Sequence, residues 1–308
     1  MPANKLIVLG SVNADHVVQV NAFPRPGETI TGHGYQVLPG GKGANQAVAA
    51  ARFGADIGFI ACLGSDDFGT RMEQAFREDG MDTRAVMAVP DMPTGIAFIQ
   101  IAANGENSIV ISAEANACLT PAILEPHLNY LRQAQTLLMQ LESPMETVEL
   151  AAFEARKAGV AVILNPAPAR PLSDALLAAL TMITPNETEA EMLTGIKVTD
   201  AASACTAAHK LRDKGVQSVL ITLGAQGAYY SGPEGERLIP GFRVQATDTT
   251  AAGDTFNGAF AAALQEGLDV DAAIRMAHAA AAISVTRLGA QTSIPYRAEI
   301  DTFLQSKS

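Results

Sequence analysis

The 308-residue sequence has no tryptophan, and aromatic residues of any kind make up only 5% of it. Positive charge is scarce as well: 21 lysines and arginines stand against 32 aspartates and glutamates, for a net charge of −11. A nucleic-acid-binding surface requires clustered basic residues, and the sequence has no such block. We therefore expect no nucleic-acid partner. A phosphate-bearing ligand is not excluded, because backbone amides and a metal ion can supply a local positive field.

Cysteine is also in short supply, with only Cys62, Cys118 and Cys205. Their number is odd, they lie far apart, and none belongs to a CxxC pair or has a histidine at a spacing typical of zinc sites. We interpret all three as small core residues of a protein in a reducing compartment.

Two kinds of targeting segment are missing. No run approaches the roughly 20 apolar residues that span a bilayer, so we expect no membrane partner. The first apolar run begins at Leu6 without a charged-then-apolar leader before it. Together with the isolated cysteines, these absences predict a cytoplasmic protein.

What the sequence does contain is a large apolar fraction, 48%, which is enough for a core that needs no disulfide or metal. Short apolar runs alternate with amphipathic segments, and this alternation predicts a single three-layer α/β domain over residues 1–308. A mostly parallel central sheet would carry helices on both faces. One predicted helix, over residues 143–159, is expected to begin with a capping box of Ser143 and Glu146. Predicted strands cover residues 6–9, 57–62, 136–141, 160–164, 182–184 and 218–222; the other predicted helices cover residues 45–53, 66–80, 120–133, 200–215 and 255–265.

Two stretches, at about residues 14–38 and 95–112, break this alternation. Both contain extended, partly alternating runs, and the second includes Asn104-Gly105, the dipeptide typical of a tight hairpin turn. We expect these stretches to form a small antiparallel sheet inserted into the main domain.

Residues 250–254, with the letters TAAGD, lead into a predicted helix and form the first candidate site. The unpaired amides at a helix start, together with the helix dipole, bind anions. Asp254 at the mouth of such a site can accept a proton from an attacking hydroxyl while the amides hold a phosphoryl group. The alternative is that Asp254 only caps the helix.

Residues 40–45, GGKGAN, open another predicted helix and imitate two phosphate-binding loops without matching either. Gly43 stands where a Walker loop has Ser or Thr, and Gln46 stands where the dinucleotide-binding loop has its third glycine. What remains is a backbone that a ligand can approach closely, with Lys42 and Asn45 as donors. The alternative is a glycine-rich turn with a solvated lysine.

Polar side chains also follow predicted strands. Asn13 and Asp15 come after the first strand and lie on one side by alternation, and Glu142 follows the strand over residues 136–141. Ligands of open parallel sheets bind beyond the carboxyl ends of the strands, and an amide beside a carboxylate suits vicinal sugar hydroxyls. The alternatives are an Asx turn and a solvated strand end.

Two later strand ends carry further candidates. Asn186 and Glu189 form either a plain capping box or part of a polar cluster that orients Mg²⁺-bound water near nucleotide phosphates. Residues 222–227, TLGAQG, form a tight turn whose glycines either make a hairpin or let an adenosine lie against the backbone.

In this order along the chain, the motifs resemble those of the ribokinase family, also called the pfkB family of carbohydrate kinases, over nearly the whole length. Residues 40–45 are similar to the family's first signature, and residues 248–258, DTTAAGDTFNG, are similar to its second and highly specific one. Residues 13–15, 141–143, 165–169 and 186–189 resemble the ribokinase branch more than the wider family.

This resemblance implies a ribokinase-like fold with the small sheet as a lid, and ATP-dependent phosphorylation of D-ribose at O5. It implies Asp254 as the base and the amides of Ala251, Ala252 and Gly253 as the anion hole, with Mg²⁺ held through water by Glu189. The implied sugar contacts are Asn13, Asp15, Gly41, Lys42, Gly43, Asn45, Glu142 and Asp254. The implied ATP contacts are Asn186, Thr222, Leu223, Gly224, Ala225, Gln226, Gly227, Gly253 and His278.

The resemblance also implies a monovalent cation, usually K⁺, beside the anion hole. Its oxygen ligands would come from Asp248, Thr250 and the backbone near Ser284, Arg287, Gly289 and Ser293. An ordinary helix-ending loop is the alternative for residues 286–293. Because the family's lid often pairs across two subunits, a homodimer is expected.

The sugar contacts favour ribose as the acceptor. Asn13 is a polar partner that a 2-deoxy sugar would leave unsatisfied, at a cost of about 1–3 kcal/mol for a buried group. The rival acceptors are 2-deoxyribose, fructose and nucleosides. A rival of another class is a non-catalytic sugar or nucleotide sensor on the same fold.

Overall fold

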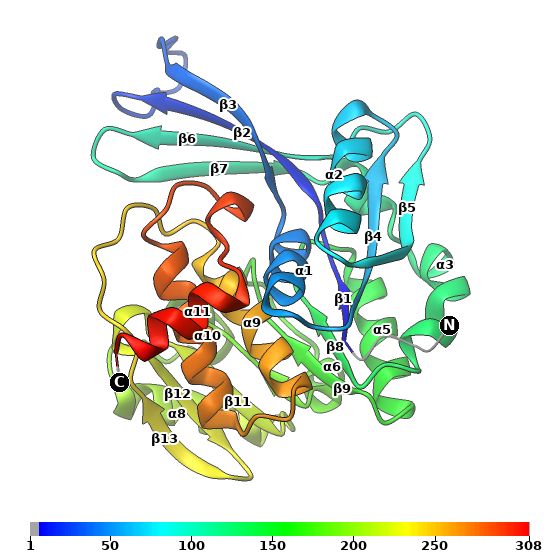
Figure 1. The fold of residues 1–308 in the computed structure, drawn as a ribbon, viewed down its shortest axis with the longest axis vertical. Helices are drawn as coiled ribbons and strands as arrows, with labels where there is room; N and C mark the ends of the chain where they lie inside the picture. The colour runs from blue at the N-terminus through cyan, green and yellow to red at the C-terminus, as the bar shows by residue number, and fades with distance from the viewer. Residues whose placement is uncertain (1–5, 308) are drawn as a thin grey trace.

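The computed structural model describes residues 6–307, and nine strands of this part form a central sheet (Figure 1). Its strands are β1 (Leu6–Leu9), β4 (Ile57–Gly64), β5 (Asp82–Val89), β8 (Thr136–Met139), β9 (Ala161–Leu164), β10 (Met182–Ile183), β11 (Ser218–Thr222), β12 (Ala228–Gly232) and β13 (Gly235–Ile239). Their order is β13-β12-β11-β10-β9-β8-β1-β4-β5. All neighbours from β5 to β11 run parallel, and β12 is antiparallel to both β11 and β13.

Helices cover both faces of this sheet, as the alternation of strand and helix predicts. Side chains of β1 show why: Leu6 and Val8 enter one apolar core, whereas Ile7 and Leu9 enter the other. The first core is closed by α1 (Lys42–Phe53), α2 (Asp67–Glu78), α9 (Ala252–Gln265), α10 (Val270–Ser284) and α11 (Arg297–Gln305). The second is closed by α3 (Pro121–Leu124), α4 (Leu128–Leu131), α5 (Met145–Lys157), α6 (Asp174–Ala179), α7 (Glu187–Thr194) and α8 (Ala201–Asp213).

A separate four-stranded sheet contains β2 (Asn13–Val20), β3 (His33–Gly40), β6 (Gly95–Ala102) and β7 (Asn107–Ser112), in the order β3-β2-β6-β7. The predicted hairpin at Asn104-Gly105 joins β6 to β7. The expectation of an antiparallel sheet is wrong at its centre, where β2 and β6 are parallel. Both strands begin at the main body, with Asn13 opposite Gly95, so they leave it in the same direction.

Several local predictions also fail. The segment over residues 120–133 is not one helix but α3, a 3₁₀ turn (Glu125–His127) and α4. Pro126 lies in the break, where it offers no N–H to an α-helical ladder. The capping box at Ser143 is absent, because α5 begins after Pro144 and the Ser143 hydroxyl has no hydrogen-bond partner. The sequence analysis also missed β5, β12, β13, α6, α10 and α11.

The cysteines differ from one another in their surroundings. Cys62 is buried as expected, but Cys118 and Cys205 are only partly buried. The expectation that no cysteine has a histidine at metal-site spacing is wrong for Cys205. Because His209 follows one turn later on α8, the Sγ atom of Cys205 lies 3.8 Å from the Nε2 atom of His209.

The topology places one edge of the central sheet under the small sheet. The chain enters the sheet at β1, between β4 and β8, so the strand order reverses there. Such a switch point is where ligands bind in open α/β sheets. From β1 the chain passes directly into β2, and Figure 1 shows the small sheet projecting beyond this edge. Within residues 6–307, no helix has the length and apolar character needed to cross a membrane.

Candidate active site

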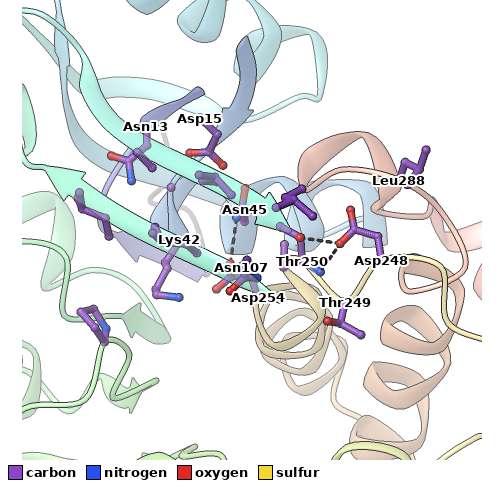
Figure 2. A pocket seen from close by; sticks show the side chains of 18 of the residues that line it. Asn13, Asp15, Lys42, Asn45, Asn107, Asp248, Thr249, Thr250, Asp254 and Leu288 are labelled. Carbon is purple, nitrogen blue, oxygen red and sulfur yellow. Dashed lines mark hydrogen bonds between the residues drawn. The ribbon is translucent and has the colours of Figure 1, made fainter. Parts of the chain in front are cut away.

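A cavity of about 820 Å³ lies under the small sheet at the carboxyl edge of the central sheet. Figure 2 shows Asn13 and Asp15 on one side of it and Lys42, Asn45 and Asp254 on the other. The cavity brings together seven of the eight predicted sugar contacts: Asn13, Asp15, Gly41, Lys42, Asn45, Glu142 and Asp254.

The eighth predicted sugar contact, Gly43, does not line this cavity. It is buried at the start of α1, where an added Cβ atom would lie 2.4 Å from backbone atoms of Gly10 and Ser11. Gly43 therefore lets α1 begin directly against the end of β1, and its role is in packing.

Asp254 is held from both sides by amide groups of α1. Its Oδ2 atom accepts a hydrogen bond from Asn45 Nδ2 at 2.9 Å, and its Oδ1 atom accepts one from Gln46 Nε2 at 3.0 Å. The two helices come this close because of Gly258, where a Cβ atom would lie 2.3 Å from the Gln46 carbonyl oxygen. The carboxylate is thus fixed in one orientation, with an exposed fraction of 6% for the residue.

Gln46 is a residue that the sequence analysis noted only as a mismatch to the dinucleotide-binding loop. It is completely buried. Its Oε1 atom accepts a hydrogen bond from Gln140 Nε2 at 2.7 Å, and its Nε2 also donates to Asn165 Oδ1 at 3.0 Å. A chain of buried amides therefore lies behind the carboxylate. The available signal was that Gln46 follows Asn45 on the first turns of the same helix.

The alternative that Asp254 only caps a helix is wrong. The N-cap of α9 is Ala251, with no side-chain cap, and the Asp254 carboxylate bonds to α1 instead. Ala251 itself has φ 57° and ψ 16°, a left-handed conformation that costs a residue with a Cβ atom roughly 1–2 kcal/mol. Such strain gathers at functional sites. Among the predicted anion-hole amides, that of Ala252 donates to the Thr249 carbonyl at 3.2 Å.

The charges in the first cavity act on one another. Burial and, to a smaller extent, the nearby Glu142 and Asp254 together raise the pKa of Asp15 to about 7, against the opposing effect of Lys42. Burial alone would lower the pKa of the Lys42 amine. The surrounding carboxylates, Asp254 foremost, outweigh burial and hold that pKa above its ordinary value. Lys42 therefore stays protonated.

Hydrogen bonds orient the polar side chains that face the first cavity. Asn116, which the sequence analysis missed because nothing distinguishes it in the sequence, donates from Nδ2 to Asn13 Oδ1 at 2.8 Å. The Asn13 amide oxygen is thereby engaged. Glu142 accepts from the Ser11 hydroxyl at 2.6 Å and from the Lys42 backbone N–H at 3.1 Å. Glu142 is therefore not merely a solvated strand end.

A second cavity of about 370 Å³ lies beside the first and has a different lining. Apolar side chains dominate its walls, among them Phe242, Val244 and Phe256. His278 also lines it, 5.0 Å from the Phe256 ring, and burial lowers the histidine pKa to about 4, so the ring is neutral. The predicted ATP contacts that line this cavity are Asn186, Thr222, Gly224, Ala225, Gly253 and His278.

The other three predicted ATP contacts, Leu223, Gln226 and Gly227, close the turn between β11 and β12 and do not line the cavity. The Leu223 N–H donates to the Gly227 carbonyl at 2.8 Å. The hairpin interpretation of residues 222–227 is confirmed, and Thr222, Gly224 and Ala225 also line the second cavity. The contact with adenosine stays a prediction.

A third, polar cavity of about 220 Å³ touches residues of both others. It shares Lys42 and Asp254 with the first cavity and Asn186 and Gly253 with the second. Glu189 faces it, and burial raises the pKa of this carboxyl. The capping box is also present: Glu189 N–H donates to Asn186 Oδ1 at 2.8 Å, and Glu189 Oε2 accepts from the Asn186 N–H at 2.9 Å.

Asp248 joins two loops beside the start of α9. Its Oδ1 atom accepts from the Thr250 N–H at 2.9 Å (Figure 2). Its Oδ2 atom accepts from the Gly289 N–H at 2.9 Å. These bonds lower the pKa of Asp248 in spite of its burial. Three predicted cation contacts thus meet: Asp248, Thr250 and Gly289.

The remaining predicted cation contacts lie on the segment that follows α10. The Ser284 carbonyl accepts the Arg287 N–H at 3.0 Å, and the Arg287 side chain pairs with Glu299. Ser293 is buried, and its hydroxyl donates to the Ala290 carbonyl at 2.7 Å. The carbonyl of Ser284 therefore already accepts a backbone hydrogen bond, and the hydroxyl of Ser293 is hydrogen-bonded within its own turn.

Comparisons with known proteins were made on the whole chain. The profile described as "pfkB family carbohydrate kinase" matches residues 3–297. The chain is 55% identical to the ribokinase of Haemophilus influenzae, over 97% of this chain and 98% of that one. It is also 37% identical to the deoxyribokinase of Salmonella typhi, over 97% and 98% of the two chains.

A solved structure extends this likeness to three dimensions. The structure of Arabidopsis thaliana ribokinase complexed with ribose and ATP superposes with a TM-score of 0.90 and 35% identity, covering 98% of this chain and 99% of that one. The match in sequence and in fold spans both sheets and all three cavities. This chain belongs to the pfkB family of carbohydrate kinases.

Proposed function

We propose that this chain transfers the γ-phosphoryl group of ATP to O5 of D-ribose, with Asp254 as the base. The observation that carries the proposal is the place of Asp254. Its carboxylate stands where the first cavity meets the third cavity, which leads to the apolar second one. Full-length similarity to a ribokinase at 55% identity supports the choice of reaction.

In this proposal the ribose lies in the first cavity and the adenosine lies in the second. The Asp254 carboxylate takes the proton of the 5-hydroxyl as O5 forms its bond to the γ-phosphorus. The bond from phosphorus to the bridging oxygen breaks, and ADP leaves. Asn45 and Gln46 keep the carboxylate aimed at the cavity. The protonated Lys42, which lines the first and third cavities, offsets charge on the phosphoryl oxygens.

Backbone amides at the start of α9 are the second element of the proposed chemistry. The N–H groups of Ala251 and Gly253, with the helix dipole, form an anion site next to the base. Ala252 joins them only when its bond to Thr249 opens. The left-handed Ala251 holds these amides in place before the substrate arrives.

The residues around the third cavity fit a magnesium ion bound with ATP. Mg²⁺ keeps several waters and takes oxygen ligands, and Glu189 and Asn186 offer side-chain oxygens there. When bound, the ion neutralises charge on the phosphate oxygens. We propose that Glu189 orients one of its waters.

The loops joined by Asp248 fit a monovalent cation, for which we propose K⁺. Oxygen atoms of Asp248 and Thr250 lie within one hydrogen-bonded cluster beside the anion site. A carboxylate with neighbouring backbone carbonyls is the donor set that a hard cation prefers. Replacing K⁺ by Li⁺ should lower turnover, and an equal rate in both salts would contradict this site.

We further propose that the small sheet is a lid, inserted at about residues 14–38 and 95–112 of a single domain, and that two chains pair through it. Its inner face lines the first cavity with residues such as Ile99 and Ile109. Its outer face exposes a row of apolar residues, Val37, Phe98 and Val110, which a second copy would cover. Three free cysteines support a cytoplasmic location.

The test is ADP release with Mg-ATP and K⁺, measured with D-ribose, 2-deoxy-D-ribose, D-fructose and adenosine as acceptors. The proposal predicts the highest kcat/KM with D-ribose. Preference for 2-deoxyribose, the alternative suggested by similarity to a deoxyribokinase, would keep the mechanism and overturn the acceptor. Ribose binding without ADP release from any acceptor would instead indicate a sensor.

A further inference from the structure

A second cluster of reactive side chains lies far from the three cavities. Cys205 and His209 occupy one face of α8, a turn apart, and Glu236 faces them from the edge strand β13. Figure 1 shows α8, β12 and β13 together at the end of the molecule opposite the small sheet. None of these three residues lines a substrate cavity.

The distances within this cluster approach those of a tetrahedral metal centre. Cys205 Sγ lies 3.8 Å from His209 Nε2 and 3.8 Å from Glu236 Oε2, and His209 Nε2 lies 2.7 Å from Glu236 Oε1. A zinc ion with its usual bonds to sulfur, nitrogen and oxygen sets such ligand atoms about 3.3–3.6 Å apart. Only the distance between His209 Nε2 and Glu236 Oε1 is too short, and rotation of these two exposed side chains can lengthen it.

The neighbours of the cluster orient Glu236 as the supporting residues of a metal site do. Ser231 donates its hydroxyl to Glu236 Oε1 at 2.8 Å, and Arg212 lies 3.5 Å from the same oxygen. The Oε2 atom faces the thiol instead. The Tyr229 hydroxyl lies beside Cys205 and Glu236 and offers a further oxygen at the cluster. Partners of this kind fix ligand geometry.

We propose that Cys205, His209 and Glu236 form a binding site for Zn²⁺ or a similarly thiophilic divalent cation. Thiolate and imidazole donors select such ions over Mg²⁺, which requires oxygen ligands. Binding releases the thiol proton and leaves a fourth position for water or the Tyr229 oxygen. The ion joins α8 to the edge hairpin of β12 and β13 and stabilises that hairpin.

The test is a Co²⁺ titration of the full-length, nucleotide-free protein, followed by absorbance. Tetrahedral Co²⁺ bound to a thiolate gives a sulfur-to-metal charge-transfer band and intense visible bands. We expect both bands at one equivalent and competition by Zn²⁺. Cys205→Ser should abolish the charge-transfer band. His209→Ala should weaken binding by at least about 10-fold, the scale on which ligand-shell changes act.

The matched control is Cys118→Ser, which removes another partly buried thiol and should leave the spectrum unchanged. Zn²⁺ should also raise the melting temperature of the unmodified protein and of this control, but not that of Cys205→Ser. Absence of the bands at millimolar Co²⁺, or bands that persist in Cys205→Ser, would overturn the proposal and leave a hydrogen-bonded surface cluster. Turnover of ribose with Mg-ATP plays no part in this readout.

Discussion

The first and second cavities lie side by side yet recognise their proposed ligands by opposite means. The first is lined by four carboxylates, of which Asp15, Glu142 and Asp254 raise the pKa of the buried Lys42 amine and Asp248 lies in the loop before α9. The second has apolar walls, a neutral His278 and backbone of the β11–β12 turn. Ribose offers only hydroxyls, so a specific site must provide oriented polar groups. Adenosine offers a large flat surface that apolar walls can bury without charged groups.

The largest effect should follow from removing the proposed base. Asp254→Asn keeps the size and one of the two hydrogen bonds accepted from α1. Its amide cannot accept the proton, so kcat should fall by at least about 10²-fold. Ribose affinity, measured by calorimetry in the absence of ATP, should stay within a few-fold of the unmodified protein. Nearly full turnover in this variant would remove Asp254 from the mechanism.

Replacing Asp15 should change both the affinity for ribose and the stability of the folded protein. Asp15→Asn loses charge-assisted hydrogen bonds to the sugar, which should raise the KM for ribose by about 10–100-fold. The same change should stabilise the ligand-free protein at neutral pH. Because the folded-state pKa of Asp15 is raised to about 7 from 3.8, its stabilising contribution is complete below pH 4 and is lost as pH rises through 7.

The measurement for this coupling is urea unfolding of both proteins at pH 5 and pH 8. Relative to the unmodified protein, Asp15→Asn should gain about 2–3 kcal/mol between these two values, because about two pKa units of the shift lie above pH 5. Lys42 titrates above this window and does not contribute. If the difference in unfolding free energy between the two proteins is the same at pH 5 and at pH 8, ionisation of Asp15 does not destabilise the folded protein.

The amide chain behind Asp254 should affect turnover more than binding. Gln46→Ala removes one of the two donors to the carboxylate, so kcat should fall by about 10-fold with little change in the KM for ribose. In Gln46→Glu, a second carboxylate beside Asp254 should move the acidic limb of the kcat–pH profile upward. Gln140→Leu, which touches Gln46 but not Asp254, is the control and should leave that limb in place. A profile in Gln46→Glu identical to that of the unmodified protein would limit Gln46 to packing.

The smallest effect is expected on the nucleotide side. His278→Leu replaces a neutral ring by an apolar side chain of similar length, so the KM for ATP should change by less than about 5-fold. The ratio of the KM for ATP in His278→Leu to that in the unmodified protein should be constant from pH 5.5 to pH 8. The reason is that the imidazole, with its pKa of about 4, is uncharged throughout this range. A ratio that varies across this range would mean that His278 acts through its charge.

The sequence predicts the layered fold well because its signals are local. Strand runs such as residues 6–9 and helix caps such as Asp66 and Asp200 act over a few neighbouring residues, and the structure confirms them. The parallel pairing of β2 with β6 could not be predicted, since it depends on where two distant hairpins leave the body.

In the candidate site, too, local motifs were predictable and contacts between distant residues were not. Asn13, Asp15, Lys42 and Asp254 stand in recognisable motifs, and the structure brings them to one cavity. Gln46 and Asn116 act through contacts with residues about 100–200 positions away. Apart from the position of Gln46 next to Asn45, no sequence pattern marks these two residues. Cys205 and His209 had a readable spacing, but the third member of their cluster, Glu236, comes from another element.

The difference between the first and second cavities is tested most directly by how the first cavity distinguishes ribose from 2-deoxyribose. The measurement is the ratio of kcat/KM for these two sugars in the unmodified protein and in Asn13→Ala. An oriented, buried amide that a deoxy sugar leaves unsatisfied should give a preference for ribose of about 5- to 150-fold, the equivalent of 1–3 kcal/mol, and Asn13→Ala should lose most of it. Equal kcat/KM values for the two sugars in the unmodified protein would contradict selection of ribose by the first cavity. A preference for ribose that survives in Asn13→Ala would contradict the role of Asn13 in it.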